Sequence, residues 1–221
     1  MPTYLVTGTN RGIGLEYCRQ LKAKGDEVIA VCRSVNDELK ELNIETIADI
    51  DITSDQSVAK LVTQLGDRPL DVLINNAGIV ERVNLSNLDF ESIRKQFEVN
   101  ALGTLRVTHA LLPNLKDGSK IAIMTSRMGS IEDNTSGGSY GYRMSKVAVS
   151  MAGKSLALDL KPRGIAVAIL HPGLVQTRMT NFTSSGITPE TSVKGLLARI
   201  DELNLGNTGT FWHANGEVLP W

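Results

Sequence analysis

The apolar residues of this 221-residue chain fall into runs of two lengths, and the two kinds of run alternate along the sequence. The short runs are rich in β-branched residues and nearly continuous in apolar character, as strands buried on both faces of a parallel sheet are. Longer segments with helical spacing separate them. This alternation predicts an α/β fold, a doubly wound (Rossmann-like) parallel sheet with helices on both faces in three layers. The short runs are Tyr4 to Thr7, Val28 to Cys32, Val72 to Ile74, Lys120 to Thr125 and Ile165 to Leu170.

Boundary signals accompany three of the longer segments. Ile13, Tyr17 and Leu21 recur at four-residue steps, and Gly25 follows them as a stop signal. The run Thr53-Ser54-Asp55-Gln56 has the capping-box pattern, which predicts the start of a second helix. Thr188-Pro189-Glu190 predicts the start of a third, with proline at the first helical position and an acid in the first turn.

Composition and charge exclude several classes of protein. With 23 basic and 24 acidic residues the formal charge is −1, which argues against binding nucleic acid through an overall basic field. No apolar run approaches the roughly 18 residues of a membrane span, and the N-terminal residues lack a secretory signal pattern. We expect a cytoplasmic protein in which Cys18 and Cys32 are buried, reduced thiols. Without a repeat or a charged linker, residues 1–221 are expected to form a single domain.

A glycine-rich turn directly follows the first predicted strand. Gly8, Gly12 and Gly14 are spaced G-x-x-x-G-x-G, which differs from the G-x-G-x-x-G fingerprint and lacks the G-K-[ST] ending of a P-loop. Glycines let the backbone approach a ligand closely, and the free N–H groups of the following helix favour a phosphate. The strand–turn–helix context predicts dinucleotide binding, although glycines at these positions also suit a simple tight turn.

The residues after the second predicted strand indicate which dinucleotide binds. A cofactor without a 2′-phosphate usually meets an acidic residue about 20 positions beyond the glycines. Here that place is Ser34, next to Arg33, and no carboxylate is present. A guanidinium at this place suits a 2′-phosphate, and Arg11 in the glycine turn adds a second positive charge. We therefore expect NADP rather than NAD; the alternative is that both arginines are ordinary surface residues.

Tyr142 and Lys146 lie four residues apart at the start of a long helical stretch that runs to about Leu160. This spacing places both side chains on one face of a helix. A nearby ammonium favours a phenolate, so we expect the pKa of Tyr142 to lie below its usual value of about 10. That would make Tyr142 a proton donor and acceptor near neutrality. The alternative is a surface pair, and Tyr140 is a rival phenol, though it meets Met144 instead of a lysine.

Taken together, the motifs resemble the short-chain dehydrogenase/reductase family over essentially the whole chain. The sequences Ser139 to Lys146 and Asn215 to Trp221 are similar to those of the C-factor and sniffer-type carbonyl reductases. The motifs appear in the order Thr7-Gly8-x-x-x-Gly12-x-Gly14, Asn75-Asn76-Ala77-Gly78, Asn100, Ser126, Tyr142-x-x-x-Lys146 and Pro172-Gly173-Leu174-Val175-Gln176-Thr177.

The resemblance implies a catalytic set and a cofactor. Tyr142 would protonate a carbonyl oxygen as hydride arrives, and Ser126 would hydrogen-bond the same oxygen. Lys146 would hold the nicotinamide ribose, and Asn100 would position a water near Lys146. No metal is needed, and His109, His171 and His213 lack ligand spacing. The residues implied to bind NADP(H) are Gly8, Asn10, Arg11, Gly12, Ile13, Gly14, Arg33, Asp51, Ile52, Asn76, Ala77, Gly78, Tyr142, Lys146, Pro172, Gly173, Val175 and Thr177.

The function implied by the resemblance is NADPH-dependent, reversible reduction of aldehydes or ketones to alcohols. A C-factor-like signalling or sensor protein, in which turnover is incidental, is the alternative. Sixteen positions separate Ser126 from Tyr142, more than is usual in the family, and the extra residues form a polar loop over 131–138. Residues 178–190, with Met179 and Phe182, are expected to form a short substrate lid; the alternative is an ordinary surface loop. The family further implies a homodimer or homotetramer, a small-molecule carbonyl or alcohol substrate, and neither a membrane nor a nucleic-acid partner.

Overall fold

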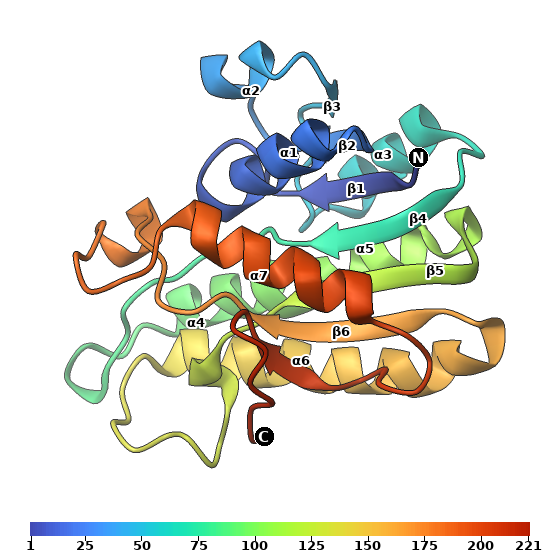
Figure 1. Cartoon of the computed structure of the whole chain (residues 1–221). Helices are drawn as coiled ribbons and strands as arrows, with labels where there is room; N and C mark the ends of the chain where they lie inside the picture. The colour runs from blue at the N-terminus through green and yellow to red at the C-terminus, as the bar shows by residue number, and fades with distance from the viewer.

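A single seven-stranded sheet passes through the computed structural model, which describes Met1–Trp221 (Figure 1). The strand order is β3-β2-β1-β4-β5-β6-β7, and every neighbouring pair is parallel. The strands are β1 (Thr3–Thr7), β2 (Glu27–Val31), β3 (Glu45–Ile47), β4 (Leu70–Asn75), β5 (Leu115–Met124), β6 (Ala166–His171) and β7 (Phe211–His213). The predicted doubly wound, Rossmann-like sheet is confirmed.

Helices cover both faces of the sheet (Figure 1). They are α1 (Gly12–Lys24), α2 (Asp37–Glu41), α3 (Asp55–Leu65), α4 (Phe90–Phe97), α5 (Thr104–Ala110), α6 (Tyr140–Leu160) and α7 (Pro189–Glu202). A π-helical turn over Glu98–Gly103 joins α4 to α5. None of these helices is long and apolar enough to span a lipid bilayer.

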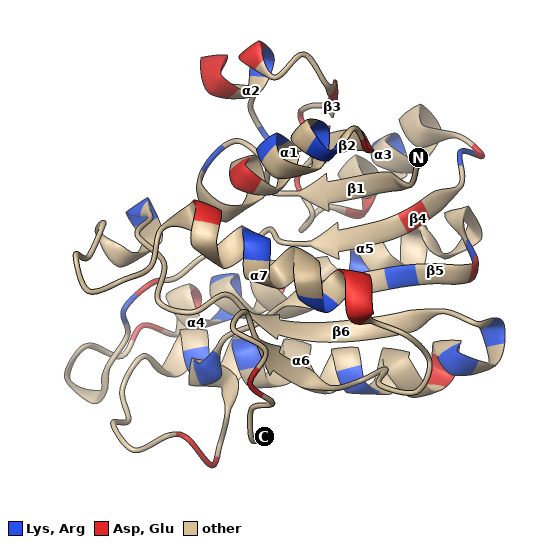
Figure 2. Cartoon of the chain, viewed as in Figure 1, with Lys and Arg blue, Asp and Glu red and all other residues tan.

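Two hydrophobic cores lie on opposite sides of the sheet. On one side, α1 and α7 pack against residues such as Val6; on the other, α3, α5 and α6 pack against residues such as Leu5. Successive side chains of a strand point to opposite faces, so a strand covered on both faces needs apolar residues at consecutive positions. This explains the nearly continuous apolar runs of the sequence. Charged residues lie mostly on helices and loops (Figure 2).

The predicted helix boundaries agree with the structure at two places and differ at a third. α1 ends before Gly25, whose φ of +83° is the left-handed conformation that favours glycine, and Thr188 caps α7 through a hydrogen bond from the Thr191 N–H. The expected capping box at Thr53 is wrong by one residue. Ser54 caps α3 by accepting from the Ser57 N–H, because the side chain of Asp51 already holds the hydroxyl and N–H of Thr53.

The sheet has two strands that the apolar runs did not predict. β3 and β7 are three residues long and occupy the two edges of the sheet. Only Ile47 of β3 is buried, so the sequence there carries no continuous apolar run. Strands this short are held by pairing with β2 and β6 rather than by a pattern of their own.

The position of the site follows from the order of the strands. From β1 the chain moves outward through β2 and β3, then returns to place β4 on the other side of β1. The connections therefore leave in opposite directions beside β1, and a crevice opens at the carboxyl ends of β1 and β4. Ligands of doubly wound sheets bind in this crevice.

Candidate active site

A cleft of about 840 Å³ opens at the carboxyl ends of the central strands. It brings together most of the residues singled out from the sequence, although they come from six separate segments of the chain. Four of those residues do not line it: Asn100, Ser126, Gly173 and Val175. The predicted residues that line it are Gly8, Asn10, Arg11, Gly12, Ile13, Gly14, Arg33, Asp51, Ile52, Asn76, Ala77, Gly78, Tyr142, Lys146, Pro172 and Thr177.

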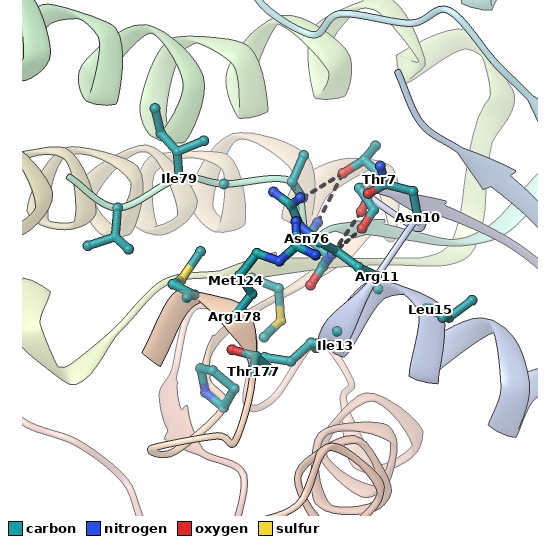
Figure 3. A pocket seen from close by; sticks show the side chains of 18 of the residues that line it. Thr7, Asn10, Arg11, Ile13, Leu15, Asn76, Ile79, Met124, Thr177 and Arg178 are labelled. Atoms are coloured by element: carbon teal, nitrogen blue, oxygen red, sulfur yellow. Dashed lines mark hydrogen bonds between the residues drawn. The ribbon is translucent and has the colours of Figure 1, made fainter. Parts of the chain in front are cut away.

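The glycine turn is packed too tightly against the end of β4 for side chains. A Cβ on Gly14 would lie 2.1 Å from the carbonyl oxygen of Gly8, and one on Gly8, whose φ is +73°, would lie 2.8 Å from Ala77 Cα. Thr7 and Asn76 hold the two segments together. The hydroxyl of Thr7 accepts from the Asn76 and Ala77 N–H groups at 3.0 and 3.1 Å, and Asn76 Nδ2 donates to the Thr7 carbonyl at 2.9 Å (Figure 3). This turn, the glycine cradle, has room only for backbone, and a glycine turn at the start of a helix suits the phosphates of a dinucleotide.

Beside this cradle lies a group of polar side chains at the end of β2. Arg33 is exposed, makes no ion pair and lines the cleft. Asn10 Nδ2 donates to Ser34 Oγ at 3.4 Å, which links the glycine turn to the same place. Hydrogen bonds from Thr53, together with the charges of Arg33 and Arg106, lower the pKa of Asp51. The unpaired guanidinium next to a hydroxyl fits a 2′-phosphate better than a neutral ribose.

Tyr142 and Lys146 are both buried at the bottom of the cleft, 9% and 5% exposed. Lys146 Nζ lies 5.7 Å from the centre of the Tyr142 ring and donates a hydrogen bond to the Met124 carbonyl at 2.9 Å. Tyr140, the rival phenol, does not line the cleft. The i, i+4 spacing thus brings Tyr142 and Lys146 together as predicted, inside the molecule rather than on its surface.

The expected pKa of Tyr142 is wrong in direction. Burial raises the pKa of the phenol, and a hydrogen bond with Ser126 offsets this only in part. Burial also lowers the pKa of Lys146 to about 8, so the ammonium is itself harder to keep charged. Burial removes both side chains from water and so disfavours the phenolate and the ammonium. This desolvation outweighs the favourable effect of a cation near a phenol.

Ser126 caps a short 3-10 turn directly after β5. Its hydroxyl oxygen accepts from the Met128 N–H at 3.2 Å, which leaves the hydroxyl proton for the hydrogen bond with Tyr142. The hydroxyl of the preceding residue, Thr125, donates a hydrogen bond to the Lys146 carbonyl at 3.1 Å and forms another with the Ser150 hydroxyl at 2.8 Å. Thr125 therefore ties β5 to the helix that carries Tyr142.

Asn100 sits in the π-helical turn, 1% exposed. Its side-chain oxygen accepts from the Ile79 N–H at 2.8 Å, while Nδ2 donates to the Ile79 carbonyl at 2.9 Å and to Ser145 Oγ at 3.0 Å. Asn100 therefore connects the segment after β4 to α6. Gly78 lies between this side chain and the Lys146 ammonium, because a Cβ there would be 3.1 Å from Asn100 Oδ1 and 3.5 Å from Lys146 Nζ.

The polar loop over 131–138 is held from two sides. Arg143 of α6 donates to the Gly137 carbonyl and to the Ser136 hydroxyl, at 3.1 and 2.8 Å. Arg127, the neighbour of Ser126, pairs with Asp133 at 3.1 Å and with Glu217 near the C-terminal residues at 2.9 Å. The loop is therefore anchored beside Ser126.

The structure adds residues to the cleft that the sequence did not single out. Ile79 to Arg82 line it after β4, and Arg178 lines it beside Met179 and Phe182, the two residues that the sequence already placed in the predicted lid. Arg82 and Arg178 are exposed and make no ion pair. Local sequence does not mark these residues, since only the topology places them at the cleft.

Two of the three histidines meet although they are far apart in the sequence. His171 at the end of β6 and His213 at the end of β7 contact edge to face, with ring centres 4.9 Å apart. Burial, the nearby imidazole of His213 and the charge of Arg127 lower the pKa of His171 to about 3, so this ring is neutral. No cluster of histidine, cysteine and acidic side chains suited to a metal ion is present.

The comparisons with known proteins agree with this geometry. The family model described as short chain dehydrogenase matches residues 2–187. A 1-hydroxy-2-glutathionyl-2-methyl-3-butene dehydrogenase of Rhodococcus sp. (strain AD45) is 41% identical over 226 residues, covering all of both chains. The C-signal protein of Myxococcus xanthus is 46% identical over 156 residues, covering 69% of this chain and 93% of that one.

Solved structures of carbonyl reductases share the whole fold. The carbonyl reductase Sniffer of Drosophila melanogaster is 31% identical with a TM-score of 0.89, and both chains are covered completely. An NADPH-bound carbonyl reductase from chicken fatty liver is 28% identical with a TM-score of 0.89, covering 100% of this chain and 99% of that one. The cleft, the ordered motifs and these matches lead to one conclusion: the chain belongs to the short-chain dehydrogenase/reductase family of oxidoreductases.

Proposed function

We propose that this protein is an NADPH-dependent reductase of aldehydes and ketones in which Tyr142 is the proton donor. The observation that carries the proposal is the burial of Tyr142 and Lys146 together at the bottom of a cleft that also contains the glycine cradle. A binding protein would not need a buried ammonium 5.7 Å from the ring centre of a buried phenol, because both groups are costly to remove from water.

Each polar residue has a distinct part in this reaction. Bound NADPH supplies the hydride. Tyr142 Oη donates its proton to the carbonyl oxygen of the substrate, and the raised pKa of the phenol keeps this proton in place until the transfer. The Ser126 hydroxyl, held by the Met128 N–H, donates a second hydrogen bond to the same oxygen. Lys146 binds the ribose of the nicotinamide, and Asn100 holds the surrounding segments in register.

The choice of NADP(H) rests on Arg33 and Ser34, a cation and a hydroxyl at the end of β2, where Arg33 forms no ion pair with a carboxylate. Solved neighbours give this choice further support. They include the NADPH-bound chicken enzyme and a Pseudomonas aeruginosa carbonyl reductase in complex with NADP, which is 27% identical with a TM-score of 0.88 over the full length of both chains.

Two relatives suggest a different physiological role for the same site. The Rhodococcus relative is named as a dehydrogenase of a hydroxylated glutathione conjugate, and the unpaired Arg82 at the cleft suits an anionic substrate. The C-signal relative suggests signalling. A thioether alcohol therefore belongs in the substrate panel in the oxidative direction, and signalling remains the alternative in which turnover is incidental.

The test of the proposed function is loss of nicotinamide absorbance when purified protein meets NADPH and a panel of aldehydes and ketones. We expect turnover that Tyr142→Phe lowers by at least 100-fold, since general acid catalysis typically contributes ~10²–10⁴-fold. Tyr140→Phe is the matched control and keeps the wild-type rate. A wild-type rate no higher than that of Tyr142→Phe across the panel would refute the enzymatic reading in favour of the signalling one.

The cofactor assignment has its own test. Arg33→Asp replaces a cation with an anion next to the expected 2′-phosphate, so we expect the Kd for NADPH to rise at least 100-fold and that for NADH to change less than threefold. Fluorescence titration with each nucleotide measures both values. Equal losses for the two nucleotides would mean that Arg33 does not bind the 2′-phosphate.

A further inference from the structure

Two arginines reach into the cleft from opposite sides and point toward one another (Figure 3). Arg11 belongs to the glycine turn after β1, and Arg178 begins the 3-10 turn Arg178–Thr180 after β6. Both are exposed and line the cleft, and the side chain of neither forms a hydrogen bond or an ion pair within the protein.

Acidic side chains are present in the cleft, but each has other partners. Glu38 pairs with Arg19, Glu81 pairs with Lys95, and Glu190 is held by Thr188 and by its own N–H. Asp51 accepts from Thr53. Two convergent guanidinium groups without a carboxylate repel one another, and an anion between them removes this repulsion while adding charge-assisted hydrogen bonds.

The place of this pair in the fold distinguishes one phosphate of the cofactor from another. Arg33 follows β2, whereas Arg178 follows β6, and β1 with its glycine turn lies between them in the sheet. Arg178 and Arg33 therefore approach the cradle from opposite ends. The helix start that follows Gly8, Gly12 and Gly14 is where a pyrophosphate binds, and Arg11 is part of it.

We propose that Arg178 and Arg11 clamp the pyrophosphate of the dinucleotide from its two sides, which fastens the segment 178–190 to the bound cofactor. This inference rests on the proposed function, because it takes NADP(H) as the ligand.

Hydrogen bonds inside and at the base of the segment 178–190 tie the position of Arg178 to that of the rest of the segment. Its base is closed by the hydrogen bonds from Gln176 Nε2 to the Gly186 carbonyl at 2.8 Å and from the Ile187 N–H to the Leu174 carbonyl at 2.8 Å. The Thr180 hydroxyl accepts from the Thr177 N–H at 3.2 Å and fixes the turn that Arg178 begins. Phe182, 67% exposed, lies in the same loop and lines the cleft.

The first experiment titrates NADP⁺ and NAD⁺ into the wild type and three variants by calorimetry. Because both nucleotides contain the pyrophosphate, we expect Arg178→Gln to raise both Kd values by the same factor of about tenfold or more, as loss of a hydrogen bond to a charged group does. Arg33→Gln raises only the Kd for NADP⁺. Arg94→Gln removes a charge from the exposed surface of α4, outside the cleft, and changes neither.

The second experiment follows cleavage by chymotrypsin after Phe182. Saturating NADP⁺ slows this cleavage in the wild type and in Arg94→Gln, but leaves it unchanged in Arg178→Gln, although that variant is also saturated. Both results are binding and protection measurements, so neither depends on turnover.

The outcomes separate this inference from the proposed function. If the wild type binds neither nucleotide, both fail together. If the wild type binds and Arg178→Gln binds equally well, or loses affinity for NADP⁺ alone, the pyrophosphate clamp is refuted and the reductase proposal stands. If Arg178→Gln binds both nucleotides as well as the wild type but has a raised KM for anionic substrates alone, Arg178 binds the substrate instead. That result would likewise refute the clamp.

Discussion

At the scale of single residues, the buried pair Tyr142 and Lys146 determines how the site depends on pH. Desolvation raises the pKa of the phenol and lowers that of the ammonium to about 8. At pH 7 the phenol is therefore neutral, and most of the lysine still carries its charge. A neutral phenol is the form that donates a proton, so the unliganded pair is set for carbonyl reduction rather than for alcohol oxidation.

We expect the rate of carbonyl reduction to be flat between pH 6 and 7 and to fall as pH rises through about 8. The sign follows from the lysine, because a group with a lowered pKa loses its proton early and then no longer binds the ribose hydroxyls as a cation. Steady-state rates at subsaturating NADPH, measured from pH 6 to 10, give the profile, because saturating nucleotide would hide the weaker binding of the ribose.

Lys146→Arg is the control for this assignment. Arginine stays protonated over this range, so the fall near pH 8 should disappear even if the overall rate is lower. An identical inflection in the arginine variant would show that another group is responsible.

At the scale of elements, the π-helical turn Glu98–Gly103 connects the segment after β4 to α6 through the hydrogen bonds of Asn100. The extra residue in the turn aims the Asn100 side chain at Ile79 and Ser145 at the same time. Gly103, in the same turn, lets the helix approach Ile52, since a Cβ there would lie 2.8 Å from its Cδ1. Such turns concentrate at functional sites because they point a side chain where a regular helix would not.

We expect Asn100→Ala to lower the free energy of unfolding by about 3 kcal/mol, because it leaves the N–H and carbonyl of Ile79 without their partner inside the protein and removes one of the two hydrogen bonds of the Ser145 hydroxyl, which keeps its bond to the Tyr142 carbonyl. The same variant should lower the turnover number more than tenfold, since Gly78 and Lys146 pack beside this side chain. Urea denaturation and steady-state kinetics measure the two effects.

Asn87→Ala is the matched control, an exposed asparagine that accepts one hydrogen bond from the Asn84 N–H. Its cost should stay below about 1 kcal/mol, without an effect on turnover. If Asn100→Ala unfolds at the same urea concentration as the control, the packing of the segment after β4 against α6 does not depend on the Asn100 side chain.

At the scale of the whole molecule, an apolar stripe runs along the outer face of α6. Met144, Met151 and Leu158 recur at seven-residue intervals and are 48%, 65% and 64% exposed. Leu102 and Leu105 from the neighbouring π turn and α5 are 47% and 39% exposed. A seven-residue repeat of exposed apolar residues on one helix face is the pattern of a helix that packs against another helix, so we propose a homodimer through this stripe.

We expect the wild type to migrate as a dimer and Met151→Glu as a monomer, because the substitution places a charge in the middle of the apolar contact. Size-exclusion chromatography with light scattering gives the masses. Leu85→Glu, at a site 71% exposed and outside the stripe, is the control and should remain dimeric. A monomeric wild type, or a dimeric Met151→Glu, would contradict the interface.

Much of the fold was predictable because its signals are local. The strands β1, β2, β4, β5 and β6 are buried on both faces and so have apolar residues in sequence, and Gly25 and Thr188 act within one turn of the helices that they bound. The edge strands β3 and β7 have three residues each and no such run. Their place depends on backbone pairing with β2 and β6, which a sequence pattern does not contain.

The sequence by itself determined the doubly wound class of the sheet, the glycine turn after β1 and the pairing of Tyr142 with Lys146, because each can be recognised from runs, motifs or spacings along the chain. Tertiary structure alone decided the direction of the Tyr142 pKa, since burial comes from segments far along the chain. It also decided that Arg178 faces Arg11 across the cleft. The spacing between neighbouring residues can be taken directly from the sequence. The desolvation of Tyr142 and the convergence of charges from distant segments arise only when the chain has folded.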